Sequence, residues 1–141
     1  MALNVKRAEV WAVTIEDRAG GAADKLEPLA RAGANFEFVF TRRTPENPGK
    51  GLLVAYPVKG AKVVRAAQEA GFAKPIDMFS VRIEGSDKPG VTAAVARALA
   101  QADLSFRGLS ATGSGRKFIS FVALDSEADA TRAVAVLKKL R

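Results

Sequence analysis

The sequence predicts an α+β protein in which antiparallel sheets are covered by helices on one face. Three observations support this fold class: β-branched apolar runs alternate with helical periodicities, glycine-rich turns separate them, and the chain of 141 residues matches itself when shifted by 70. The chain has 48% apolar and 26% charged residues, a balance typical of a compact globular protein. This composition excludes a disordered chain.

The first half of the chain reads strand, helix, strand, strand, helix, strand. Each predicted helix ends at a glycine, Gly33 or Gly71. Pro28 lies inside the first helix, where it removes a backbone donor, so we expect a kink or a late start there. This order is that of a ferredoxin-like βαββαβ unit. The expected strands are residues 10–16, 35–43, 52–56 and 76–85, and the expected helices are residues 22–32 and 61–70.

The second half repeats this order. Strands are expected at residues 81–84, 105–112 and 117–124, and helices at 91–102 and 127–140. The shift of 70 pairs like residues at matching structural places, among them Asp17 with Asp87, Gly20 with Gly90, Leu29 with Leu99 and Phe36 with Phe106. A duplicated unit explains these matches better than chance does. We therefore predict two ferredoxin-like units in tandem, at residues 1–75 and 76–141, with their antiparallel sheets side by side.

The second unit lacks a fourth strand after its last predicted helix. An unpaired sheet edge promotes aggregation, so natural proteins usually cover it. Residues 3–10 alternate apolar and polar side chains and are long enough to supply the missing strand. We expect this segment to complete the second unit and residues 76–79 to complete the first.

Aromatic side chains are interpreted as core. Phe36, Phe38 and Phe40 alternate at strand spacing, and we expect them to face the helices. Trp11 lies in the first predicted strand and is expected to pack in the core or between the units.

The composition removes most catalytic chemistry. The chain contains no Cys and no His, which excludes disulfides, thiolate or imidazole metal ligands and a serine–histidine triad. We therefore expect no enzyme, no metal and no cofactor. The N-terminus lacks the apolar centre of a signal peptide, and no apolar run is long enough to cross a membrane. The expected location is cytoplasmic, without a membrane partner.

The net charge of +7 raises nucleic acid as a partner. The residues Lys117 to Leu124 resemble the third-strand signature of RNA-recognition domains. However, Ile119 stands where that signature has a stacking aromatic, and base stacking contributes about 1–3 kcal/mol per base. We expect no specific nucleic-acid partner, and an RNA-binding βαββαβ protein is kept as a lesser alternative.

Two loops carry the candidate binding chemistry. Each runs from a strand into a helix, where the first amides lack intrahelical partners and the helix dipole favours an anion such as an α-carboxylate. An aspartate in the loop can accept an α-ammonium group, while Asn35 offers both a donor and an acceptor. The competing interpretation is an ordinary N-cap and turn. The loops are Asp17, Arg18, Ala19, Gly20 and Gly21 in the first unit, and Asp87, Lys88, Pro89, Gly90 and Val91 in the second.

These loops, with Ala34-Asn35-Phe36 about fifteen residues after the first, resemble those of tandem ACT-domain proteins. The second unit has Ser105 where the family usually has Asn, and the first has Ala19 in place of Pro. The resemblance implies a non-catalytic regulatory module that binds an amino acid or similar small carboxylate through the two loops, Asn35, Phe36 and Ser105. It also implies a metabolic enzyme as a partner, and we expect a homodimer because sheet edges can pair between chains. The alternative is a protein-interaction or structural module without a ligand.

Overall fold

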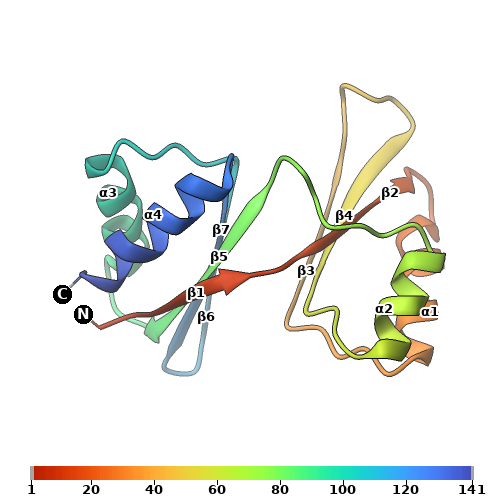
Figure 1. The fold of residues 1–141 in the computed structure, drawn as a ribbon, viewed down its shortest axis with the longest axis horizontal. Coiled ribbons are helices and arrows are strands. Elements are labelled where there is room, and N and C mark those ends of the chain that lie inside the picture. The colour runs from red at the N-terminus through yellow and green to blue at the C-terminus, as the bar shows by residue number, and fades with distance from the viewer. Residues whose placement is uncertain (1, 141) are drawn as a thin grey trace. The chain divides into compact units, whose positions relative to one another are not determined.

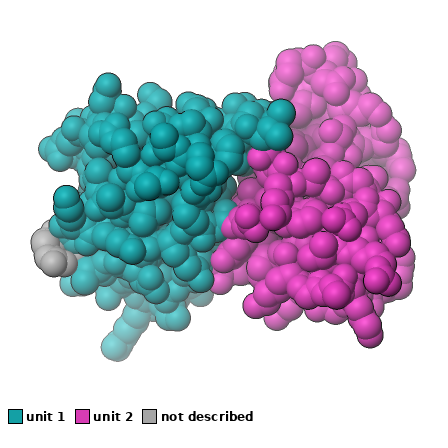
Figure 2. Space-filling model, in the orientation of Figure 1, with its two compact units in different colours: residues 1–8, 76–141 teal, residues 9–75 magenta. Residues whose placement is uncertain are grey.

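The computed structural model describes residues 2–140. The chain divides into two compact units, and the first of them is discontinuous in sequence (Figure 2). Unit 1 combines residues 1–8 with residues 76–141, and unit 2 is formed by residues 9–75. The N-terminal segment therefore belongs to the same unit as the C-terminal half of the chain.

Unit 1 has a four-stranded antiparallel sheet in the order β1-β5-β7-β6. Strand β1 pairs with β5, from Asn4 opposite Glu84 to Ala8 opposite Ser80. The N-terminal segment thus occupies the fourth-strand position that the second half of the sequence leaves vacant. The elements of unit 1 are β1 (Asn4–Ala8), β5 (Phe79–Ser86), α3 (Val91–Gln101), β6 (Gly108–Ser114), β7 (Lys117–Leu124) and α4 (Glu127–Lys138).

The core of unit 1 lies between this sheet and helices α3 and α4, which lie together on one face (Figure 1). Val91, Val95 and Leu99 recur every four residues along α3 and are all buried, which gives the helix one apolar stripe. Ser126 caps the start of helix α4, and its Oγ accepts a hydrogen bond from the amide of Asp129 at 3.0 Å. The sequence therefore specifies both where these helices begin and which face they bury.

Unit 2 has the same order of elements but a sheet of three strands, β2-β4-β3. Its fourth-strand position holds one bridge, in which Ala12 and Ala73 exchange backbone hydrogen bonds of 2.8 and 3.0 Å. Residues 76–78 lie outside any strand, so the expected strand at 76–79 is not formed there. Pro75, which has no amide hydrogen to pair, precedes them. The elements are β2 (Trp11–Glu16), α1 (Gly21–Arg31), β3 (Phe38–Arg43), β4 (Lys50–Tyr56) and α2 (Ala61–Glu69).

Helix α1 runs through Pro28 without a late start. It begins at Gly21, seven positions before the proline, so the expectation of a late start is wrong. The proline removes a single amide donor from the ladder, while its own carbonyl still accepts from Ala32. The neighbouring Leu29 is fully buried in the core of unit 2, and this packing stabilises the helix across the proline.

The aromatic stripe of β3 faces away from the helices. Val39 pairs with Ala55, which belongs to the helix-facing core, whereas Phe38 and Phe40 pair with Tyr56 and Val54. Because paired residues share a face of the sheet, Phe38 and Phe40 lie on the opposite face. The prediction that they pack under the helices is wrong for these two residues. Of the three, Phe36 packs against the helical core, and the predicted core residue Trp11 is buried there too.

Candidate functional site

The loop that enters α3 in unit 1 is exposed and its helix start is uncapped. Gly90 precedes the helix with φ at 88°, in the left-handed region that favours glycine. No side chain caps this helix, and the amides of Thr92 and Ala93 have no acceptor among the described residues. These two donors, together with the positive end of the helix dipole, suit a small anion.

The surface beside Gly90 is open. A Cβ atom added at this position would meet no atom within 4 Å, and Asp87, Lys88 and Pro89 around it are exposed. Val91 is buried in the core, and its amide already donates to Lys88 within the loop at 3.2 Å. The loop is therefore held by its own backbone, which leaves the face of Gly90 accessible.

The carboxylate of Asp87 lies against Gly113 on strand β6. A Cβ atom at Gly113 would be 2.6 Å from Oδ2 of Asp87, so the glycine makes room for this carboxylate. Within residues 2–140, Asp87 forms no ion pair and its side chain accepts no hydrogen bond. A carboxylate in this state can receive an ammonium group.

The corresponding loop of unit 2 is occupied by its own side chains. Nε of Arg43 donates to Oδ2 of Asp17 at 2.9 Å. Arg18 pairs with Asp24 at 2.7 Å, and its guanidinium lies 3.4 Å from the place of a Cβ at Gly20. Ala19 contributes a carbonyl that accepts from Arg18. The two loops therefore share a backbone but differ in what their aspartates contact.

Gly20 and Gly21 position the start of α1 closely over strand β2. Gly20 has φ at 90°, almost the value of Gly90. A Cβ at Gly21 would lie 2.1 Å from the carbonyl oxygen of Glu16, so this position accepts glycine alone without a shift of the backbone. The amide of Gly21 donates to Arg18, as that of Val91 does to Lys88.

Asn35 and Ser105 lie at the far ends of their helices from the loops. Each follows an α-helix of eleven residues, which spans about 16 Å. Both side chains are exposed, and Phe36 is half-buried against the core of unit 2. Within one unit the structure therefore does not bring Asn35 or Ser105 to the aspartate and glycine of the loop.

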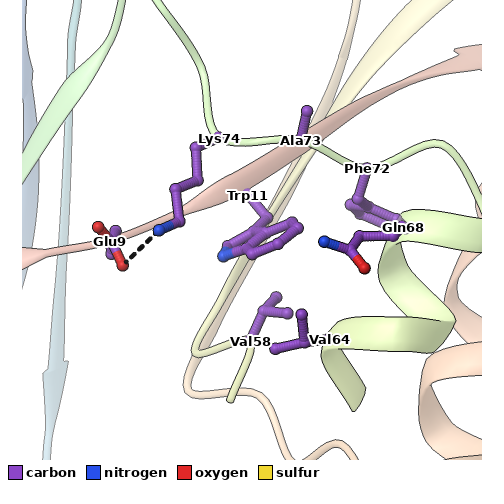
Figure 3. Close-up of a pocket in the computed structure, with 8 residues that line it drawn as sticks. All are labelled: Glu9, Trp11, Val58, Val64, Gln68, Phe72, Ala73 and Lys74. Carbon is purple, nitrogen blue, oxygen red and sulfur yellow. Dashed lines mark ion pairs between the residues drawn. The ribbon is translucent and has the colours of Figure 1, made fainter. Parts of the chain in front are cut away.

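A hollow near the start of β2 was not predicted from the sequence (Figure 3). It has a volume of about 570 Å³, and it is formed entirely by residues of unit 2. The sequence signal for it is weak, because its walls come from four segments that look like ordinary core and surface. The lining residues are Glu9, Trp11, Val58, Val64, Gln68, Phe72, Ala73 and Lys74.

Two glutamates near the ends of their strands have altered acidity. A hydrogen bond from Lys50 to Glu16 at 2.6 Å lowers the pKa of that carboxyl below its usual value. Hydrogen bonds from Arg82 and Lys117 likewise lower the pKa of Glu84. Both carboxylates are therefore held in the charged form by neighbouring cations.

The described residues hold no group of three or more acidic side chains that could bind a metal ion. None of the helices within residues 2–140 is both long enough and apolar enough to cross a membrane.

Comparison with solved structures shows the fold of the whole chain. A protein of Bacteroides thetaiotaomicron, BT0572, is 18% identical with a TM-score of 0.74, over 96% of this chain and 99% of that one. The ligand-free regulatory subunit of aspartate kinase from Thermus thermophilus is 17% identical with a TM-score of 0.65, over 99% and 97%. The same subunit from Thermus flavus is 21% identical with a TM-score of 0.56, over 96% and 95%. No curated protein matches the sequence.

The order of elements and the glycine-started helices define a class of α+β proteins built from ferredoxin-like units. The family model of the ACT domain matches residues 79–141. The match covers less than half of the chain and lies within unit 1. Unit 2 repeats its topology at residues 9–75.

Proposed function

We propose that this protein is a non-catalytic regulatory module that binds an amino acid or a similar small carboxylate at the loop entering α3. The observation that carries the proposal is the combination of a free aspartate and free helix amides around an open glycine. Asp87 has no ionic partner among the described residues, Thr92 and Ala93 have amides without acceptors, and Gly90 is unobstructed. These groups match the ammonium and carboxylate groups of one zwitterion.

The loop entering α1 is proposed as the weaker of the two sites. Arg43 already neutralises Asp17, so an ammonium group would have to displace a guanidinium that donates at 2.9 Å. Asn35 and Ser105 are too far from the loop of their own unit to touch the same small ligand. We propose that any contribution from these two residues is made toward a second copy in a homodimer.

The proposed partner is a metabolic enzyme. This proposal is supported by the likeness of the fold to that of regulatory subunits of aspartate kinase, which regulate an enzyme. Coexpression with candidate kinases, followed by a test for amino-acid-dependent inhibition, addresses this partner.

Light scattering of the purified protein gives its mass in solution and tests the homodimer.

The loop site is tested by a thermal-shift screen of the twenty amino acids. A ligand at one hundred times its Kd adds about 2.7 kcal/mol to the free energy of unfolding, which raises Tm by several degrees. The Gly90→Val variant should lose this shift, because a side chain would cover the amides of α3.

Gly33→Val is the matched control. Gly33 also has a positive φ, of 100°, and open space around it, so the backbone strain of the two variants is similar. Gly33 lies in unit 2, just after the C-terminal end of helix α1. The Gly33→Val variant should therefore keep the full ligand-induced rise in Tm. A flat screen would favour a module that binds proteins instead, and a shift that survives in Gly90→Val would remove this loop from the site.

A further inference from the structure

The hollow beside Trp11 has an apolar wall and a charged rim. Val58, Val64 and Phe72 line it together with the indole ring of Trp11, a residue that is 7% exposed (Figure 3). At its rim, Nζ of Lys74 lies 3.2 Å from Oε1 of Glu9 and 5.9 Å from the centre of the Trp11 ring. One small volume thus offers an apolar surface, a cation and an anion at once.

The ion pair at the rim is available for exchange with a ligand. The side chains of Lys74 and Glu9 are 54% and 73% exposed. Exposed pairs of this kind contribute little to stability, because water and salt screen them. Replacing the pair by two contacts to a bound molecule therefore costs little.

We propose that this hollow binds a small zwitterion with an apolar side chain, of the α-amino-acid class. Its carboxylate contacts Lys74, its ammonium group contacts Glu9, and its side chain packs against Trp11. A simple anion would face Glu9 and a simple cation would face Lys74, so a molecule with both charges is the better match. The volume of about 570 Å³ lies within the range of small-molecule sites. The site belongs to unit 2 and does not depend on the loop of unit 1.

Trp11 is the only tryptophan in the sequence, so its fluorescence reports on this hollow. Titration of the full chain with leucine, isoleucine and phenylalanine should give a saturable change in emission. The N-acetyl derivative of leucine lacks the ammonium group and leucinamide lacks the carboxylate. Each should bind at least about tenfold more weakly, since a charge-assisted contact is lost.

Two variants locate the response. Lys74→Gln and Glu9→Gln should each weaken leucine binding at least about tenfold. Lys62→Gln, which removes a lysine on α2 that does not line the hollow, should leave it unchanged. Gly90→Val should also leave it unchanged, which separates this site from the loop site.

The proposal is overturned if none of the three amino acids changes the emission. It is equally overturned if Lys74→Gln responds like the parent chain, or if N-acetyl-leucine binds as well as leucine. If Gly90→Val abolishes the emission change, the response comes from the loop of unit 1 and the hollow is not the site.

Discussion

Each of the two loop aspartates lies beside a different residue: Arg43 beside Asp17, and Gly113 beside Asp87. Arg43 and Gly113 stand 70 positions apart, which is the shift that relates the two halves of the chain. Arg43 is the last residue of β3, and Gly113 is the last but one of β6. Arg43 donates to Asp17, while Gly113 leaves the carboxylate of Asp87 without a cation. One substitution therefore separates an aspartate that is already paired from one that can accept a ligand.

Gly113→Arg should weaken amino-acid binding at the α3 loop at least about tenfold. The new guanidinium would pair with Asp87, as Arg43 does with Asp17, and would compete with the ammonium group of the ligand. Calorimetric titration with the amino acid found in the thermal-shift screen measures the effect. Gly113→Gln displaces the carboxylate by a similar volume without a charge, and it should weaken binding less. Equal losses in the two variants would indicate crowding and not charge.

The close contact of α1 with β2 depends on the absence of a side chain at Gly21. The position that matches it in unit 1 is Val91, which is buried in the core. The start of α1 thus approaches β2 more closely than the start of α3 approaches β5. The sequence repeat did not predict this difference in distance. The repeat predicts equivalent elements, but the distance between two elements depends on the residues that pack between them.

Gly21→Ala should lower the free energy of unfolding by about 3 kcal/mol or more. The added Cβ would lie 2.1 Å from the carbonyl oxygen of Glu16, and that backbone atom cannot move without disturbing strand β2. Urea denaturation measures the change. Gly108→Ala is the control, because a Cβ there meets nothing within 4 Å, and it should stay within about 0.5 kcal/mol of the parent protein. Similar values for the two variants would contradict the close contact.

Strands β5 and β7 are joined by a small charge network. Oε1 of Glu84 accepts from Arg82 at 2.7 Å, and Nζ of Lys117 on β7 lies 3.3 Å from its second oxygen. These contacts hold the pKa of Glu84 below its value in the unfolded chain. Because the folded form has the lower pKa, the stabilisation is fully present above the ordinary pKa of glutamate and is lost as the pH falls through the lowered value.

Glu84→Gln should therefore reduce the loss of stability on acidification. Near neutral pH the variant should be less stable than the parent protein, and the difference should shrink as the pH falls below the ordinary glutamate range. Urea denaturation at a series of pH values measures it. Glu69→Gln, which changes an exposed glutamate on α2 in unit 2, serves as the comparison. A constant difference between Glu84→Gln and the parent at all pH values would contradict the linkage.

The whole molecule is built from one discontinuous and one continuous unit. Strand β1 directly precedes unit 2 in the sequence, but it completes the sheet of unit 1. Val5 on β1 is 2% exposed within the core that also contains Val81 and Leu137. The folding of unit 1 thus requires contacts between residues more than 70 positions apart, and such contacts form only at a cost in loop entropy.

Val5→Asp should destabilise unit 1 by about 3 kcal/mol or more, since it buries a charge without a partner. Trp11 lies in unit 2, so tryptophan emission and far-ultraviolet circular dichroism together separate the unfolding of unit 2 from that of the whole chain. Lys6→Ser, an exposed position on the same strand, is the control. If Val5→Asp unfolds at the same urea concentration as the parent, β1 is not part of the core.

The sequence by itself determined the α+β class, the order of the elements and the two loops that begin at Asp17 and Asp87. Periodicity, capping residues and turn glycines act over a few positions, so they can be read from one sequence. Alternation also showed that Phe38 and Phe40 share a face. It could not show which face, because that depends on the partner strand.

Tertiary structure alone decided the rest. It set the register of β1 against β5, reduced the fourth strand of unit 2 to a single bridge from Ala73 to Ala12 of β2, and placed Gly113 beside Asp87. It also formed the hollow at Trp11 from segments up to 65 positions apart, Glu9 to Lys74. These features depend on which distant side chains meet, and such contacts are chosen by the packing of the whole core and not by any local pattern.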